Sequence, residues 1–222
     1  CRQDQIGSGI MIRIAKTNEE PASLTTTKAY DGEDVKKQLF ADQLSKCYLC
    51  ERVVSTDFQI EHLKSWQNFP ELRTEWRNLL LSCNYCNQKK GCRFDNIINP
   101  LESNVEDIIE QSIDYVSKRA TFESKDKTSE VEATIRLLDK IFNGESKLRK
   151  LKEEKFYEEV ESILNRFIQK TNAYKYSPSQ TAENAIREEL TMDKVLLGFK
   201  YWIIRDDPAL NTVFDSDIIW NK

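Results

Sequence analysis

Histidine is nearly absent from this sequence, which has one, His62, among 222 residues. Any chemistry that needs an imidazole therefore rests on that side chain. No apolar run reaches the roughly 18 to 20 residues that a membrane-spanning helix needs, and the start of the chain has no apolar core of the secretory kind. These features disfavour a membrane-spanning protein and one with a standard secretory leader, so we expect the chain to reside in the cytoplasm.

A surplus of positive charge is also lacking. Lysine and arginine number 33 against 37 aspartates and glutamates, which leaves a net charge of −4. Because nucleic acid is held mainly by lysine and arginine, this balance disfavours a protein that coats nucleic acid over its whole surface. Any contact with nucleic acid should be local or shared with a partner.

The cysteines give the first positive signal. Four of the six form two CxxC pairs, "CYLC" at 47–50 and "CNYC" at 83–86. Two such turns can present four thiolates to one tetrahedral ion, and in an intracellular chain they favour a metal over disulfides. We predict a structural Zn²⁺ site; the alternative is four reduced, buried thiols without metal. Its predicted ligands are Cys47, Cys50, Cys83 and Cys86.

The gap between the two pairs is longer than the usual 15 to 20 residues of a zinc ribbon, which indicates an inserted element. Two cysteines are left over. Cys92 is expected to be a small apolar filler and not a ligand. Cys1 belongs to residues 1–10, "CRQDQIGSGI", which lack a first Met and contain Gly-Ser-Gly. We interpret them as a cloning remnant, with a native upstream extension as the alternative.

The hydrophobic pattern predicts an α+β protein. Residues 11–45 should form an extended arm and then a short helix that leads to the first cysteine. "DFQIEHL" alternates and "NLLLSC" is a short apolar run, so both are predicted strands, joined by the loop 64–77. A helix should follow the second CxxC pair and end at Gly91 or at the Asn-Pro of 99–100.

After residue 100 the pattern predicts helices. A stripe of apolar residues favours a helix within 100–119, namely Ile108, Ile109, Ile113 and Val116. Further helices are predicted within 129–143, 155–170 and 177–190, and the markedly apolar 195–210 should be buried or face a partner. We therefore predict a mainly α-helical domain over 102–222 that serves assembly or partner binding.

The inserted element contains the polar residues Glu61, His62 and Asn78, and Asn87 directly follows the second CxxC pair. A single histidine is usually a satisfied core residue or an exposed one. Here a carboxylate precedes the histidine, and a metal site formed by the four cysteines can bring the later asparagines close to it. These residues therefore form a candidate site.

The motif "CYLC…IEHL…WRNLLLSCNYCNQKKG" resembles the HNH, or ββα-metal, endonuclease motif in its zinc-stapled form. The resemblance implies an HNH nuclease core over 46–101, with His62 as general base and Asn78 as the middle residue of the motif. It also implies that Asn87 occupies the last metal-binding position. Glu61 stands where the family usually has aspartate, so its ligand arm is longer by one methylene group.

Elementary chemistry supports this assignment. A neutral imidazole can accept a proton from water near physiological pH. Mg²⁺, or Mn²⁺ in its place, prefers oxygen ligands and keeps several waters, so oxygens from Glu61 and Asn87 suffice as protein ligands. Neighbouring strand residues point to opposite faces, so the strand must end or bulge at Glu61 and His62. Asn78 should bond the loop backbone that aims His62; the alternative is an ordinary asparagine at a strand start.

Three basic residues at the end of the predicted helix are candidate nucleic-acid contacts. Lys90 lies one turn after Asn87 and should face the same phosphate. Lys89 and Arg93 are further candidates, although a charged helix end is often only solvated surface.

A narrower resemblance covers residues 11–101. "QLFADQLSKCYLCE", "PELRTEWRNLLLSC" and "INPL" are similar to the PtuB family of Septu-type antiphage systems, some of which are associated with retrons. The resemblance implies an effector nuclease that works with an ABC-type ATPase partner, PtuA. DNA and RNA both stay open as substrates. The competing interpretations are a non-catalytic zinc module that binds nucleic acid or protein, and a zinc-dependent redox or scaffold protein.

Overall fold

The structure, a computed structural model, describes residues 13–218. The segment 1–10, interpreted above as a cloning remnant, lies outside the described residues. Within them, no helix combines the length and the apolar character that crossing a membrane requires. The fold is mixed α and β, as predicted, with a ββα unit near the N-terminal end and a helical C-terminal region.

Two short helices precede the ββα unit. Helix α1 (Ala22–Thr26) interrupts the arm that the sequence analysis predicted to be extended. Pro21 stands directly before its first turn, and Leu24 is buried beneath it, which explains why the polar Thr run still forms a helical turn. Helix α2 (Glu33–Asp42) is the short helix that the sequence predicts before the first cysteine, and it buries Val35 and Leu39.

The ββα unit matches its prediction closely. Strands β1 (Phe58–His62) and β2 (Leu79–Cys83) pair antiparallel, with Phe58 opposite Cys83 and His62 opposite Leu79. Helix α3 (Asn84–Lys90) follows β2 directly and ends at Gly91, whose φ of +53° suits a residue without a Cβ. All of β2 is buried because α2 and α3 both pack on it, which accounts for its unbroken apolar run.

The helix predicted within 100–119 is wrong. A single turn, α4 (Val105–Ile108), is followed by a hairpin of β3 (Glu110–Asp114) and β4 (Arg119–Glu123). The Asp114 side chain accepts hydrogen bonds from the backbone N–H groups of Val116 and Ser117, at 2.9 and 3.2 Å, and so builds the turn. Val116 lies at the hairpin tip with 96% of its surface exposed, so it joins no apolar stripe.

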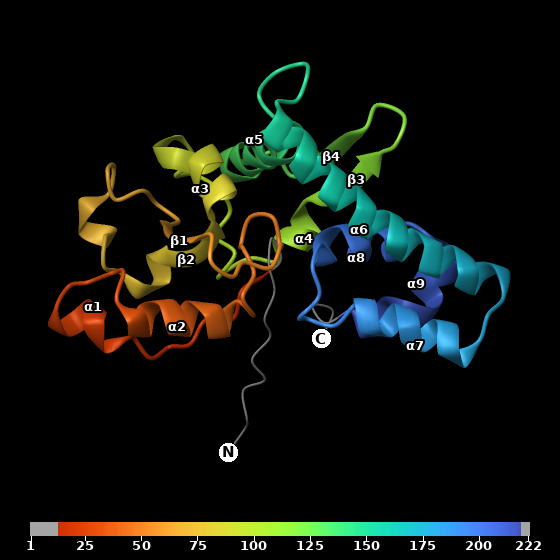
Figure 1. The fold of residues 1–222 in the computed structure, drawn as a ribbon, viewed down its shortest axis with the longest axis horizontal. Coiled ribbons are helices and arrows are strands. Elements are labelled where there is room, and N and C mark those ends of the chain that lie inside the picture. Colours follow the sequence, from red (N-terminus) through yellow and green to blue (C-terminus); the bar gives the residue numbers. More distant parts are fainter. Residues whose placement is uncertain (1–12, 219–222) are drawn as a thin grey trace.

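Five α-helices follow the hairpin within the described residues and confirm the helical character predicted for this region. They are α5 (Ser129–Asn143), α6 (Leu151–Tyr176), α7 (Gln180–Glu189), α8 (Leu197–Arg205) and α9 (Pro208–Phe214). Figure 1 shows the ββα unit with α1 and α2 on one side of the molecule and α7 to α9 on the other. Helices α5 and α6 run between the two groups.

A cluster of aromatic rings connects the ββα unit to the helical region. Tyr85 of α3 stacks on Phe156 of α6 with ring centroids 4.8 Å apart. Phe142 of α5 lies 5.1 Å from the Phe156 ring and 5.4 Å from that of Phe199 in α8. This cluster belongs to a buried core that runs through the predicted boundary at 101/102. Because the core is continuous across this boundary, the predicted division into two domains at 101/102 stays a proposal.

A carboxylate next to the first cysteine pair makes a second connection. Glu51 is buried, and its two oxygens accept the backbone N–H groups of Leu197 and Gly198 at the start of α8. The first N–H groups of a helix have no partner within it, so this carboxylate supplies the missing acceptors. Lys46 donates to the carbonyls of Met192 and Lys194 in the preceding loop.

Buried Glu106 makes the stability of the fold depend on pH. Burial raises the pKa of its carboxyl to about 8, one oxygen accepts the backbone N–H of Arg13 at 3.1 Å, and the other has no hydrogen-bond partner. The unfolded carboxyl titrates near pH 4.3. Between these values the folded state holds a proton that the unfolded state has released, so stability falls as pH rises from about 5 to 8.

We expect Glu106→Gln to flatten this slope, because an amide still accepts from Arg13 but does not ionise. The difference between the two pH profiles should reach at most about 4 kcal/mol. Urea unfolding at several pH values between 5 and 8.5 measures it. Parallel profiles for the wild type and the variant would show that Glu106 is ionised in the folded protein.

Candidate active site

The four cysteines of the two CxxC pairs meet at one point. Cys47, Cys50, Cys83 and Cys86 are buried, and their sulfurs all lie within 4.8 Å of one another. The Cys50 and Cys83 sulfurs are 3.9 Å apart, close to the roughly 3.8 Å that zinc–sulfur bonds of about 2.3 Å require in a tetrahedron. Among residues 13–218 this is the one such gathering of cysteine, histidine and acidic ligands, and it could hold a metal ion.

Arg52 lies beside the sulfur cluster and compensates negative charge there. Its guanidinium approaches the Cys83 sulfur at 4.0 Å, lies over the Phe156 ring at 4.5 Å and pairs with Glu159 of α6. A metal held by four thiolates carries a net negative charge, which a neighbouring guanidinium stabilises. The sulfur cluster is thereby fixed to the helical region as well as to the hairpin.

Cys92 is exposed and does not join the cluster. Its predicted absence from the ligand set is therefore in line with the structure, but its predicted role as a buried apolar filler is wrong. It lies in the short 3-10 turn Gly91–Arg93, in which no residue is buried.

His62 is the last residue of β1 and is held in one orientation. Its Nε2 lies 2.9 Å from the carbonyl oxygen of Arg73 in the loop between the strands. A carbonyl only accepts, so Nε2 carries the proton and Nδ1 of the neutral ring is left as the proton acceptor. The Tyr30 ring meets the imidazole edge to face at 5.0 Å.

The residue is only 5% exposed, and burial lowers the pKa of the imidazole. Lower pKa favours the neutral ring, which is the form that can accept a proton. Nδ1 of His62 is not among the fully buried side-chain atoms of the described chain that lack a hydrogen-bond partner. We infer that Nδ1, for which the described residues provide no hydrogen bond, keeps contact with solvent.

Asn78 lies where the loop rejoins β2, and its amide bonds the loop backbone as the sequence analysis expected. Its oxygen accepts the N–H of Lys64 at 2.8 Å. Its nitrogen donates to the carbonyls of Lys64 and Leu72 at 2.9 and 3.1 Å. Leu72 directly precedes Arg73, whose carbonyl holds the His62 ring. Asn78 is therefore connected to the imidazole through one backbone segment.

Asp95 is part of the site architecture and was missed by sequence reasoning. Its carboxylate accepts the backbone N–H and the hydroxyl of Ser65, each at 2.7 Å, and the side-chain amide of Asn68 at 2.6 Å. It thereby ties the start of the loop to the segment after α3. No motif marks Asp95, because its partners are 27 and 30 positions away in the sequence.

Lys90 does not face an open phosphate position, which corrects its prediction. Its side chain is completely buried, and its ammonium contacts the Glu61 carboxylate at 2.8 Å and the His62 carbonyl at 2.9 Å. Asp95 lies 3.9 Å away. The helical spacing predicted the correct side of α3, but that side packs against the end of β1 instead of opening to solvent.

Glu61 and Asn87 are the predicted ligands of the catalytic metal. Burial raises the pKa of the Glu61 carboxyl, and the Lys90 ammonium offsets part of this rise. Asn87 is half-buried, one turn before Lys90 on α3. One carboxylate and one amide oxygen fit a hard cation that keeps most of its waters. Lys90 already occupies one Glu61 oxygen, so the carboxylate has its second oxygen to offer.

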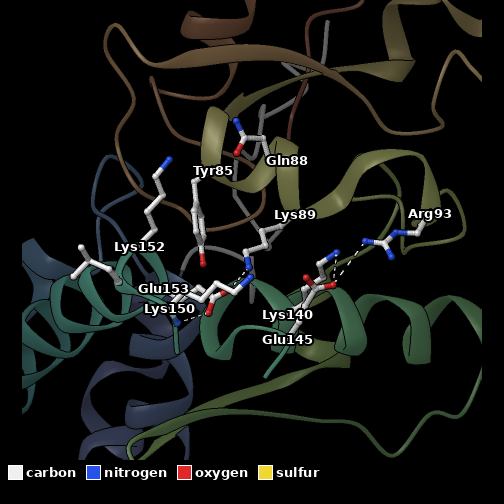
Figure 2. A pocket seen from close by; sticks show the side chains of 10 residues that line it. Tyr85, Gln88, Lys89, Arg93, Lys140, Glu145, Lys150, Lys152 and Glu153 are labelled. Atoms are coloured by element: carbon white, nitrogen blue, oxygen red, sulfur yellow. Dashed lines mark hydrogen bonds and ion pairs between the residues drawn. The ribbon is translucent and has the colours of Figure 1, made fainter. Parts of the chain in front are cut away.

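Lys89 near the end of α3 and Arg93 in the turn that follows line a pocket of about 460 Å³, to which the end of α5 and the start of α6 also contribute. Figure 2 shows Lys89 paired with Glu153, and Arg93 together with Lys140 facing Glu145. Five cationic side chains and two carboxylates line the pocket, so it is locally basic in an acidic chain. The cations are Lys89, Arg93, Lys140, Lys150 and Lys152.

Comparison with known proteins agrees with this geometry. Residues 47–93, which include the sulfur cluster, the hairpin and α3, match the family model described as HNH endonuclease. This segment is an HNH endonuclease domain. The HNH domain therefore contains His62, and it also contains the other predicted site residues between the first cysteine and Arg93.

The chain also resembles Septu protein PtuB of Bacillus thuringiensis, as the sequence analysis predicted. The two are 34% identical over 98 residues, which cover 39% of this chain and 38% of the relative. The matched part is thus less than half of either protein, and it extends beyond the HNH domain itself.

We expect the purified protein to carry about one zinc ion per chain, and Cys86→Ser to lose most of it and to unfold at a markedly lower temperature. Metal analysis by mass spectrometry together with thermal unfolding measures both effects. Cys92→Ser is the matched control, because Cys92 is exposed and outside the cluster. Equal metal content and stability in the two variants would contradict a metal site at the four sulfurs.

Proposed function

We propose that this chain is an HNH endonuclease that hydrolyses phosphodiester bonds in nucleic acid, with His62 as the general base. The orientation of His62 carries the proposal. Its Nε2 is engaged by the Arg73 carbonyl, and the ring is held at the end of a strand inside an HNH domain. The free lone pair on Nδ1 is the group that takes a proton from an attacking water.

In this mechanism the water oxygen attacks phosphorus as its proton moves to Nδ1 of His62, and the bond to the leaving oxygen breaks with its electron pair. Asn78 acts as a positioning residue, because its amide fixes the loop backbone that leads to the Arg73 carbonyl. Tyr30 limits rotation of the ring from its other side. Because the imidazole is already oriented, its reorientation adds little to the activation free energy.

Glu61 and Asn87 would hold the catalytic Mg²⁺, or Mn²⁺, whose chemistry is to stabilise negative charge on the phosphate and on the leaving oxygen. The ion at Cys47, Cys50, Cys83 and Cys86 would be Zn²⁺ in a purely structural role, since four thiolates leave no open position. We further propose Lys89 and Arg93 as contacts for backbone phosphates at the basic pocket.

The similarity to a protein named Septu protein PtuB supports a role as the effector nuclease of a Septu-type antiphage system. We propose that the chain works with a PtuA-like ABC-type ATPase, bound through the helical residues 102–222. A net charge of −4 favours this arrangement, because the partner can supply the positive surface that this chain lacks.

A second candidate function is a non-catalytic metal module that binds nucleic acid or protein. The buried pair of Lys90 and Glu61 favours it, because the ammonium already neutralises the carboxylate that would bind the catalytic metal. The two functions differ in one measurable respect, which is whether nucleic acid is cut.

We expect His62→Ala to reduce cleavage by about 100-fold or more, because removal of a general base typically costs that much. Plasmid, single-stranded DNA and total RNA are incubated with the chain, with and without the proposed ATPase partner, in Mg²⁺ or in EDTA. The variant should stay folded and keep its zinc. Unchanged cleavage by a folded variant would remove the nuclease proposal.

We expect Asn78→Ala to lower kcat by about 100-fold with little change in KM, because the loop that aims His62 loses three hydrogen bonds. Asn78→Asp is the matched control, since a carboxylate still accepts from Lys64 but cannot donate. It should retain an intermediate rate. If the alanine variant cuts as fast as the wild type, Asn78 has no positioning role.

A further inference from the structure

An exposed tryptophan is held in a fixed position beside the candidate active site. Trp66 lies four residues after His62 and is 42% exposed. It is part of a tight turn in which the N–H groups of Asn68 and Phe69 donate to the Ser65 carbonyl at 3.1 and 2.8 Å. Ser65 is in turn bonded to Asp95. These hydrogen bonds hold the turn in place, so the exposed indole has a defined position.

A row of three contacts leads from this indole to the imidazole. The Arg73 guanidinium lies 5.4 Å from the centre of the Trp66 ring and 5.3 Å from that of Tyr30. The Tyr30 ring contacts His62 at 5.0 Å. Arg73 also accepts the His62 Nε2 hydrogen bond through its carbonyl. One residue thus holds the predicted base with its backbone and bridges two aromatic rings with its side chain.

The Arg73 side chain is exposed, and none of the carboxylates in the described chain forms an ion pair with it. A guanidinium stacked between rings keeps its N–H donors at its edge, where they suit the oxygens of a phosphate. The aromatic faces suit a nucleobase, because stacking on tryptophan or tyrosine works for every base.

We propose that Trp66, Arg73 and Tyr30, here called the stacking subsite, bind one nucleotide next to the bond that is cut. Trp66 stacks on the base, and Arg73 binds the phosphate beside it. The inference rests on the proposed nuclease function and names its substrate class. A base can stack on Trp66 only when it has left the duplex, so the substrate is nucleic acid with unpaired nucleotides at the cut.

Tryptophan, tyrosine and arginine are also enriched at protein interfaces. Two observations favour a nucleotide as the occupant here. First, the Tyr30 ring of the subsite contacts His62, the proposed general base. Second, the Arg73 guanidinium forms no ion pair with a carboxylate among the described residues. Binding of a partner protein at the same residues is an outcome that the experiment below distinguishes.

The test measures binding of labelled oligonucleotides by fluorescence anisotropy in a His62→Ala background, where cleavage is blocked. Phosphorothioate oligonucleotides repeat it with His62 intact. Trp66→Leu should weaken binding of a single strand by roughly 5- to 100-fold and leave the duplex of the same sequence within about twofold. Trp66→Phe should keep most of the affinity. A strand of abasic sites should bind the wild type and Trp66→Leu equally.

Tyr176→Ala is the control, because Tyr176 is an aromatic residue 94% exposed at the end of α6 and outside the subsite. The proposal is overturned if Trp66→Leu binds single strands as tightly as this control, or loses affinity equally for single strand, duplex and abasic strand. It is also overturned if Trp66→Leu changes only association with the ATPase partner. If only the nuclease proposal is wrong, the result is different. No nucleic acid is then cut, but Trp66→Leu still weakens the binding of single strands.

Discussion

The four-sulfur cluster is the constraint on which the rest of the site depends. One cysteine pair precedes β1, and the other joins the end of β2 to the first turn of α3. Bringing the four sulfurs together fixes the hairpin against the helix, so the end of β1 comes within reach of Lys90. A hairpin of two five-residue strands has little apolar surface of its own, and a metal clip can replace part of a core in such a unit.

Lys90 shows how this arrangement positions two neighbouring residues at once. Its ammonium binds the side chain of Glu61 and the main-chain carbonyl of His62, so one cation holds both residues at the end of β1. Breaking a buried ion pair of this kind typically costs about 3 to 5 kcal/mol, whereas the complete pair contributes little net stability. Its contribution is geometric, since it fixes where β1 ends and how the imidazole leaves the strand.

The sequence was sufficient for features that depend on neighbouring residues. The CxxC spacing, the two strands, α3 and its end at Gly91 each follow from a local pattern, whereas the backbone bonding of Asn78 was expected from the resemblance to the HNH motif. It failed where two local patterns compete. Ile108, Ile109 and Ile113 suit a helix, but the turn built by Asp114 produces a hairpin. It also failed where depth matters, because no spacing shows that β1 would cover Lys90 or that Asp95 would meet a loop 30 residues earlier.

Glu51 has a consequence for the whole molecule. It directly follows a cysteine of the cluster, and its carboxylate caps the first turn of α8 from more than 140 positions away. The start of α8 therefore depends on where the four-sulfur cluster holds Cys50, and the helical region is coupled to the HNH domain through one buried carboxylate.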